Sequence, residues 1–593
     1  MRILPAEIMD RIQDRLIRLY PDGKNATLRD RLAALASRAS LPTPAPAEYW
    51  NQATSLLIAY GDMVQAPGER PLATLHRFAA QRLTGNISHI HILPFFPYSS
   101  DEGFSVIDYR EVDPRLGNWE DLHRMGEDFG LMFDLVLNHC SRESEWFKLF
   151  SAGVAPMRNY FITMETDGDL SSVVRPRTSP LLTSAQTPNG ERWVWTTFSA
   201  DQVDLNFATP DVLFEFLEIL LFYAENGARI IRLDAIAYLW KRPGTSCINL
   251  PETHEVVKLL RDFLEMVAPG TLLLTETNVP REQNISYFGA GDEAHMVYQF
   301  SLPPLLLHSL YTGSTRHLTA WAQSLPELPD GCTFLNFTAS HDGIGVRPLE
   351  GLVSDEELRH LVEQVRHRGG HVSSRTGPDD QDIPYELNIT YFDALADPGH
   401  PGTERHIDRF LCSQAIMLAM RGVPAVYFHS LTATPNDHHG VERTGQFRSI
   451  NRRRWNADEL NALLDDATSI SARVFIRYRR LLRLRAEHPA FHPDGGQRVL
   501  DLPDGLFGLV RTAPDGGERI ASISNLTNRP RNLELGAQLH AAGIAGCEGS
   551  CAELIRSEVE DLTGDGIQQL KPYETIWLVL PAPNGRTADP QED

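Results

Sequence analysis

Three acidic residues follow short apolar segments of this sequence, each at the point where a buried strand would end. They are Asp234 in IRLDAIAY, Glu276 in LLTETN and Asp342 in SHDGIG. A carboxylate beside apolar strands costs free energy, so an acid there is expected to have a task. Two carboxyl groups about 5 Å apart can cleave a glycosidic bond with retention, one as an ionised nucleophile and one as a protonated acid. Asp234 and Glu276 fall on successive predicted strands and are the expected pair.

A basic residue accompanies the first of these acids. Arg232 precedes Asp234 by two positions, and the period-2 alternation of a strand directs both side chains to the same side. A guanidinium group there would lower the pKa of Asp234 and keep it ionised. Glu276 has no basic neighbour in sequence, so we expect it to stay protonated at neutral pH. Taken alone, the R-x-D pattern fits a buried structural ion pair equally well.

The elements that must position these acids are eight short apolar segments, with helical stretches between many of them. Near-continuous apolar runs are typical of parallel strands that are covered on both faces. Eight such strands predict an α/β fold, a (β/α)8 TIM barrel, whose site lies at the carboxyl ends of the strands. A doubly wound open sheet is the alternative, and the acids at strand ends favour the barrel. The segments begin at Ser55, Ser88, Gly130, Ala228, Thr271, Met296, Cys332 and Val423.

The predicted barrel spans residues 55–496 and is interrupted twice. Residues 140–205 and 343–395 are too long for simple connections, so we expect two insertions on the C-terminal face. Residues 1–54 predict a helical N-terminal extension. Residues 497–583 contain short alternating segments that predict a small antiparallel β-domain, and residues 584–593 predict a disordered tail.

The composition limits the partners. The 593 residues carry a formal net charge of −23, which disfavours nucleic acid and anionic membranes and requires a local cationic cluster for any anionic ligand. No apolar run approaches the roughly 18 residues that cross a bilayer. The first residues lack the pattern of a secretion signal, and the six cysteines do not form a disulfide framework. We therefore expect a cytoplasmic protein without membrane or nucleic-acid partners.

The acids belong to an ordered set of motifs, one per strand. DLVLNH, GARIIRLDA, LLTETN and FTASHD lie on the third, fourth, fifth and seventh predicted strands, and SSDEGFSVIDYREVDPRLG precedes them. In this order they resemble the α-amylase superfamily of glycoside hydrolases and transferases, over roughly residues 55 to 500. The resemblance implies that Asp234 is the nucleophile, Glu276 the general acid/base and Asp342 a stabiliser of the transition state.

Finer segments resemble the sucrose phosphorylase subgroup, which transfers glucose from a glucoside to inorganic phosphate. They include HILPFFPYSSDEGFSVIDYR, WVWTTFSADQVDLNF and SINRRRW. The resemblance implies that phosphate is a co-substrate and that no cofactor is needed. It further implies a glucosyl site formed by Asp101, His139, Arg232, His341, Asp342 and Arg448, apolar walls from Phe104 and Phe198, and phosphate contacts from Arg177, Tyr238 and Tyr385. A solvated loop for Arg177 and simple packing for Tyr238 are the alternatives.

The acceptor side departs from sucrose phosphorylases. This chain has Glu386 where they carry Gln, and Val174 where they carry Tyr. Its overall pattern looks more like the bacterial glucosylglycerate and glucosylglycerol phosphorylases, and we favour glucosylglycerate as the donor. The charge of Glu386, assigned to the substrate site, would repel the carboxylate of glycerate unless a cation lies nearby. The candidate cations in the second insertion are Arg347, Arg366, Arg368 and His371. For each of them, a solvated surface position is the more common interpretation.

Other classes remain open at this stage. A plain α-glucosidase or amylase would use the same carboxylates with water as acceptor. A non-catalytic relative is disfavoured because the three acids, the arginine and both histidines are present. Some amylases hold calcium near DLVLNH, but Asp134 and Asn138 are too few oxygen ligands to predict a metal site. The expected partners are a small glucoside and phosphate, in a monomer or a homodimer.

Overall fold

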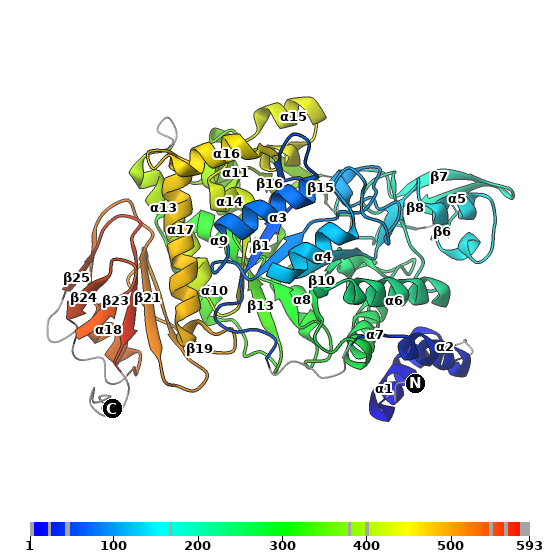
Figure 1. Cartoon of the computed structure of the whole chain (residues 1–593), viewed down its shortest axis with the longest axis horizontal. Coiled ribbons are helices and arrows are strands. Elements are labelled where there is room, and N and C mark those ends of the chain that lie inside the picture. Colours follow the sequence, from blue (N-terminus) through cyan, green and yellow to red (C-terminus); the bar gives the residue numbers. More distant parts are fainter. Residues whose placement is uncertain are drawn as a thin grey trace.

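The computed structural model describes residues 5–21, 25–41, 48–165, 169–377, 381–397, 402–544, 550–561 and 567–581. Its centre is a closed barrel of eight parallel strands in the order β1-β17-β13-β12-β11-β10-β4-β3 (Figure 1). Closure rules out the open sheet and confirms the predicted (β/α)8 barrel. The strands are β1 Leu56–Ala59, β3 His89–Ile92, β4 Gly130–Val136, β10 Ala228–Asp234, β11 Leu272–Thr275, β12 Met296–Tyr298, β13 Thr333–Asn336 and β17 Val423–Tyr427.

Helices cover the outside of the barrel, so the strands are buried on both faces and apolar nearly throughout. Local signals set several helix starts, such as the capping box of Asn118 and Asp121 at α4 and the first-turn proline of α7. The helices are α3 Pro71–Arg82, α4 Trp119–Asp128, α6 Pro210–Glu225, α7 Pro251–Val267, α8 Arg281–Ile285, α9 Leu302–Thr312, α10 Arg316–Gln323, α13 Glu404–Ala419, α14 Phe428–Thr432, α16 Ala457–Asp465 and α17 Ile470–Glu487.

Two long excursions leave the barrel after β4 and after β13. The first begins at β5 His139–Ser141 and returns at β9 Gln202–Asp204, which pair antiparallel. It contains α5 Glu145–Ser151 and the sheet β6 Thr163–Met164, β8 Gly190–Trp195, β7 Leu182–Thr187. The second contains α11 Asp355–His367, α12 Tyr391–Ala394 and the sheet β14 Ile344–Gly345, β16 Asp382–Asn388, β15 His371–Thr376. Both follow strand carboxyl ends, where barrel sites form.

Smaller units flank the barrel on two sides (Figure 1). The helices α1 Ala6–Leu19 and α2 Asn25–Ser37 precede it, and α1 packs on α7 through an Arg15–Asp262 ion pair of 2.5 Å. An antiparallel sheet follows it, in the order β19-β20-β21-β26-β23-β24. Its strands are β19 Gly496–Val499, β20 Leu506–Thr512, β21 Arg519–Asn525, β23 Ser550–Glu553, β24 Glu558–Asp561 and β26 Thr575–Leu580, with β22 Arg531–Glu534, α18 Leu535–Ala541 and β25 Ile567–Leu570 beside it. The predicted disordered tail lies outside the described residues.

One buried arginine joins the barrel to the segments around it. Arg485 on α17 is 1% exposed, and its guanidinium group donates hydrogen bonds to backbone carbonyls from separate parts of the chain. The accepting carbonyls belong to Gln52, Thr54, Leu418, Gly422 and Phe491.

Replacing Arg485 by Met should therefore destabilise the whole domain. The substitution leaves these buried acceptors without donors, and the expected loss of unfolding free energy is about 3 to 5 kcal/mol, measured by urea unfolding. Arg483→Met on the same helix is the control, because that side chain is 62% exposed and should change stability by less than about 0.5 kcal/mol. Equal effects of the two variants would contradict this role for Arg485.

Candidate active site

The two expected catalytic acids lie on adjacent strands, as their sequence positions predicted. β10 pairs with β11 so that Leu233 faces Thr275, which places Asp234 and Glu276 side by side just beyond. Arg232 Nη1 contacts Asp234 Oδ1 at 2.8 Å, while Arg232 Nη2 lies 4.0 Å from Glu276 Oε2. Arg232 also pairs with Asp134 on β4, its partner in register. One buried cation therefore serves three carboxylates.

Burial dominates the protonation of this pair. It raises the pKa of Asp234 well above its ordinary value, against the opposing effect of Arg232. Arg232 lowers the pKa of Asp234, as predicted, but burial raises it more, and the sequence does not reveal how completely the carboxylate is removed from water. Burial also raises the pKa of Glu276. Two such neighbours share a proton, and the closer contact of Arg232 to Asp234 places the charge on Asp234 and the proton on Glu276.

A strained turn holds the second acid. Ala235 directly follows Asp234 and has φ 49° and ψ 30°, a left-handed conformation that is unusual for a residue with a Cβ. In this conformation its N–H donates to Glu276 Oε2 at 3.0 Å. The turn continues into the 3-10 helix of Ile236–Tyr238. Backbone strain of this kind is retained where the surroundings fix it, and here it orients a carboxylate.

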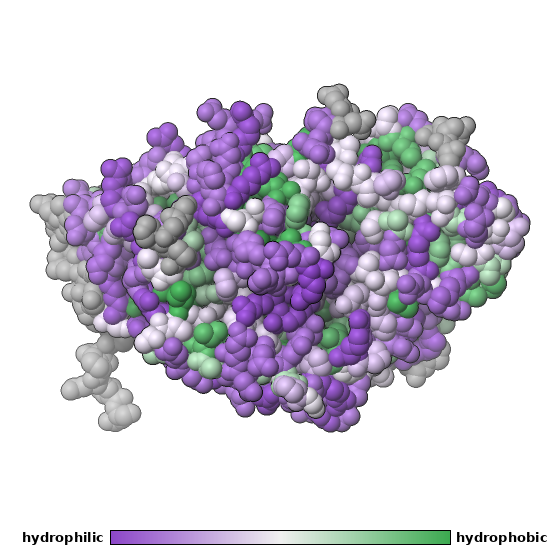
Figure 2. Space-filling model, turned by 90° about the horizontal axis from the view of Figure 1, so that it is seen from above, coloured by the Kyte–Doolittle hydropathy of each residue, from purple (hydrophilic) through white to green (hydrophobic). Residues whose placement is uncertain are grey.

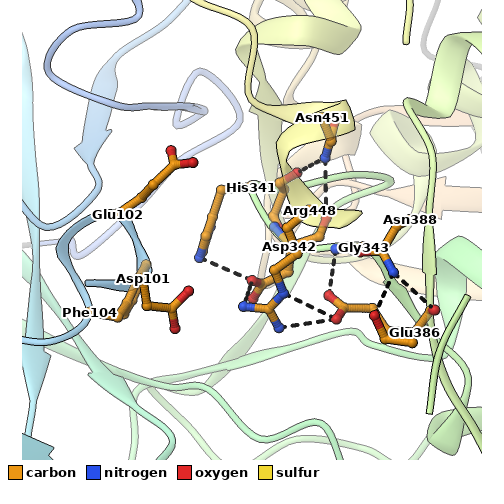
Figure 3. A network of polar contacts seen from close by, with 12 residues as sticks. Asp101, Glu102, Phe104, His341, Asp342, Gly343, Glu386, Asn388, Arg448 and Asn451 are labelled. Carbon is orange, nitrogen blue, oxygen red and sulfur yellow. Dashed lines mark hydrogen bonds and ion pairs between the residues drawn. The ribbon is translucent and has the colours of Figure 1, made fainter. Parts of the chain in front are cut away.

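A second arginine lies between two further carboxylates (Figure 3). Arg448 Nη1 contacts Asp342 Oδ1 at 2.7 Å, and its Nε and Nη2 donate to Glu386 Oε2, each at 3.1 Å. The N–H of Gly343 donates to the other Glu386 oxygen at 2.5 Å. Glu386 is 2% exposed, so its charge is neutralised inside the protein rather than presented to a ligand. Burial raises the pKa of Asp342, but Arg448 and its other basic neighbours outweigh it and hold the pKa below the usual range.

The opposite wall comes from the loop after β3. Phe104 stacks on the ring of His341, with centroids 4.9 Å apart and planes 8° apart. Gln202 donates to Asp101 Oδ2 at 3.3 Å and lies 3.2 Å from His139 Nε2. Burial lowers the pKa of His139, so its imidazole is neutral at physiological pH. This wall presents hydrogen-bonding groups beside a flat apolar ring, which is suited to a pyranose.

A third group of residues lies beyond Glu276. Arg177 lies over the rings of Phe198 and Tyr385, at 5.8 and 5.4 Å, and Phe198 meets Tyr238 edge to face at 5.5 Å. The Tyr238 hydroxyl is buried without a hydrogen-bond partner among the described residues. Arg177 belongs to the first excursion, whereas Tyr385 is on β16 of the second. Both insertions therefore contribute to this side of the site.

Most of these groups line one cavity. Every predicted site residue lines it except Arg232, which lies behind the carboxylates that it contacts. The lining also includes residues to which no role was assigned from the sequence, among them Gln202, Thr277, Asn278, Phe300 and Phe337. Gln202 belongs to the segment SADQVDLNF, but a glutamine in such a segment is equally typical of a surface residue.

Comparisons with known proteins agree with this geometry. The sequence model of the alpha-amylase catalytic domain matches residues 85–342. The glucosylglycerate phosphorylase of Allomeiothermus silvanus is 46% identical over 98% of this chain and 100% of its own length. That of Escherichia coli is 41% identical over 96% of this chain and 99% of its own. The chain belongs to the alpha-amylase family. A crystal structure of sucrose 6F-phosphate phosphorylase from Thermoanaerobacter thermosaccharolyticum shares 28% identity and a TM-score of 0.70, over 80% of this chain and 94% of that one.

The surface of this alpha-amylase family member is mainly hydrophilic on the face seen from above (Figure 2). Large exposed apolar side chains in the described part of the chain are spread over several segments, with two of them on α17: Ile17, Tyr49, Val154, Phe447, Ile470 and Ile476. None of the described helices is both long and apolar enough to cross a bilayer.

A lysine that the sequence did not single out fills the space beside Asn138. Lys241 Nζ contacts Asp204 Oδ2 at 2.5 Å and donates to Asn138 Oδ1 at 2.5 Å. Asp204 also accepts a hydrogen bond from the Thr197 N–H at 2.9 Å, and both charged side chains are almost completely buried. The ammonium group thus connects the start of the first excursion to its end. It also contacts the Tyr238 carbonyl in the turn after β10.

Replacing Lys241 by Met should leave the Asp204 carboxylate buried and unpaired. The expected loss of unfolding free energy is about 3 to 5 kcal/mol, measured by urea unfolding. Lys148→Met is the matched control, because Lys148 lies exposed on α5 of the same excursion. An effect of Lys241→Met no larger than that of the control would contradict a structural role for this ion pair.

Proposed function

We propose that this protein is a retaining α-glucoside phosphorylase that converts 2-O-α-glucosylglycerate and inorganic phosphate into α-glucose 1-phosphate and glycerate. The observation that carries the substrate is the similarity, at 41% to 46% identity over most of the chain, to three relatives that are glucosylglycerate phosphorylases. The chemistry is supported by Asp234 and Glu276 on neighbouring strands, with Arg232 nearer to Asp234.

In the first step, the ionised Asp234 attacks the anomeric carbon of the glucosyl group. The bond from that carbon to the glycerate oxygen breaks, and Glu276 gives its proton to the leaving oxygen. Asp342, Arg448, His341, Asp101 and His139 would hold the hydroxyls of the ring. The apolar ring of Phe104 would exclude water from the reacting carbon.

In the second step, a phosphate oxygen attacks the same carbon from the side that glycerate left. The ester bond to Asp234 breaks, and Glu276 takes up a proton from the phosphate, which restores the enzyme. Arg177, Tyr238 and Tyr385 would bind phosphate through charge-assisted hydrogen bonds. The carboxyl pair supplies both nucleophile and acid, so phosphate is the only co-substrate in this proposal, and no cofactor or metal is assigned.

The proposal also includes the cellular location of the enzyme and its partners. Cys140, Cys247, Cys332 and Cys412 are free thiols and are buried, which is usual for proteins of the reducing cytoplasm, where we place this enzyme. We assign it small-molecule partners only, as a monomer or a homodimer.

A synthesis assay tests the function. Purified protein is given α-glucose 1-phosphate with glycerate, glycerol, fructose or water alone, and phosphate release is followed. The expected result is fast release with glycerate and slow release in the other three. Fast release with fructose or glycerol alone would reassign the acceptor to that of a sucrose or glucosylglycerol phosphorylase. The same rate in all tubes, water included, would make the protein a hydrolase.

Glu276→Gln tests the acid role separately. The variant cannot protonate a poor leaving group, so cleavage of glucosylglycerate should fall by about a hundred-fold or more. Formation of the glucosyl-enzyme from α-glucosyl fluoride should be spared, because fluoride leaves without a proton. Rapid-quench measurement of fluoride release with both donors gives the comparison, and equal losses on the two donors would argue against the acid role.

A further inference from the structure

The second excursion places a buried arginine two residues after Gly345, which lines the cavity. β14 pairs with β16 so that Gly345 faces Glu386, and the N–H of Val346 donates to the Tyr385 carbonyl at 3.1 Å. Arg347 comes next and is only 8% exposed. Its Nε and Nη1 have no hydrogen-bond partner among the described residues. A buried guanidinium group with free donors is costly, and it is expected to face a ligand.

A second arginine lies close to the first. Arg375 on β15 contacts Glu350 Oε1 through Nη2 at 3.1 Å, and Arg347 Nε is 3.5 Å from the same oxygen. Two guanidinium groups therefore share one carboxylate, whose side chain is 43% exposed. Arg375 Nε is also buried without a hydrogen-bond partner in the described part of the chain. The group keeps an excess of positive charge and unused donors.

The positive charges of Arg347 and Arg375 affect the pKa of a hydroxyl group in the cavity lining. Burial raises the pKa of the Tyr238 hydroxyl, which lines the cavity, and Arg347, Arg177 and Arg375 oppose that rise, Arg347 most strongly. Arg347 follows the end of β14, where Gly345 lines the cavity beside Asn278: a Cβ at Gly345 would lie 2.7 Å from the Asn278 amide. The other candidate cations are engaged or exposed elsewhere: Arg368 donates to the Ala396 carbonyl, His371 stacks on Phe447, and Arg366 is exposed.

We propose that Arg347 and Arg375 bind the carboxylate of the acceptor and make the enzyme specific for an anionic acceptor. The inference rests on the proposed function and names the residues that recognise the acceptor. A planar guanidinium group suits a carboxylate, and desolvated charge-assisted hydrogen bonds are strong. Glu386 does not oppose this, because Arg448 and the Gly343 N–H already satisfy it. A neutral acceptor would leave the buried arginine donors unpaired and would be rejected.

The test compares kcat/KM for glycerate and for glycerol in the synthesis direction, with saturating α-glucose 1-phosphate. The variants are Arg347→Gln and Arg375→Gln, with Arg366→Gln as the control because it lies exposed in the same excursion. Each of the first two should lower kcat/KM for glycerate roughly ten- to a hundred-fold, with a much smaller change for glycerol. The control should keep the wild-type ratio, and Arg347→Lys, which retains the charge, should fall between.

Hydrolysis of α-glucosyl fluoride, which needs no acceptor other than water, reports that each variant is folded. If Arg347→Gln fails this control, Arg375→Gln, on β15, decides. A wild-type preference for glycerate that persists unchanged in the folded variants would overturn the carboxylate site and leave the proposed function intact. Wild-type enzyme that does not distinguish glycerate from glycerol would contradict the proposed function itself.

Discussion

The buried guanidinium group of Arg232 lies among three carboxylates, and the rest of the site depends on how its single charge is divided. It contacts Asp134 and Asp234 and lies 4.0 Å from Glu276. One cation cannot hold three buried carboxylates ionised, so the most distant acid keeps the proton. The arrangement requires β4, β10 and β11 to be neighbours in register, which the closed barrel ensures. The proposed division of roles between nucleophile and acid therefore follows from strand order.

The excursions extend the same principle outward from the barrel. Arg448, after β17, joins Asp342 to Glu386 of the second excursion, and all three line the cavity. Farther from the carboxyl pair, basic groups predominate. Arg177, Arg347 and Arg375 all lower the pKa of the Tyr238 hydroxyl. Glu350 is the carboxylate that Arg347 and Arg375 contact. A chain of net charge −23 thus concentrates positive charge where phosphate and a carboxylate would have to bind.

The sequence predicted what depends on local patterns. Apolar runs located the barrel strands, and the positions of Asp234 and Glu276 at strand ends placed them together. It could not predict contacts between distant segments: Lys241 with Asp204, Glu386 with Arg448, or the burial of Arg347, which looked like a surface residue. For the same reason the sequence predicted the lowering effect of Arg232 on the pKa of Asp234 but not the larger, opposite effect of desolvation, which is set by all the surrounding elements.

The central claim is a covalent glucosyl bond to Asp234, and trapping that intermediate tests it most directly. A glucosyl fluoride with a second fluorine on the ring slows both displacement steps and lets the intermediate accumulate. Mass spectrometry of the intact protein and of its peptides then locates the label. The account predicts one fluoroglucosyl group, on the peptide that contains Asp234 and on that residue, released faster by phosphate than by water alone. A label on another residue, or turnover of the reagent without any covalent adduct, would contradict it.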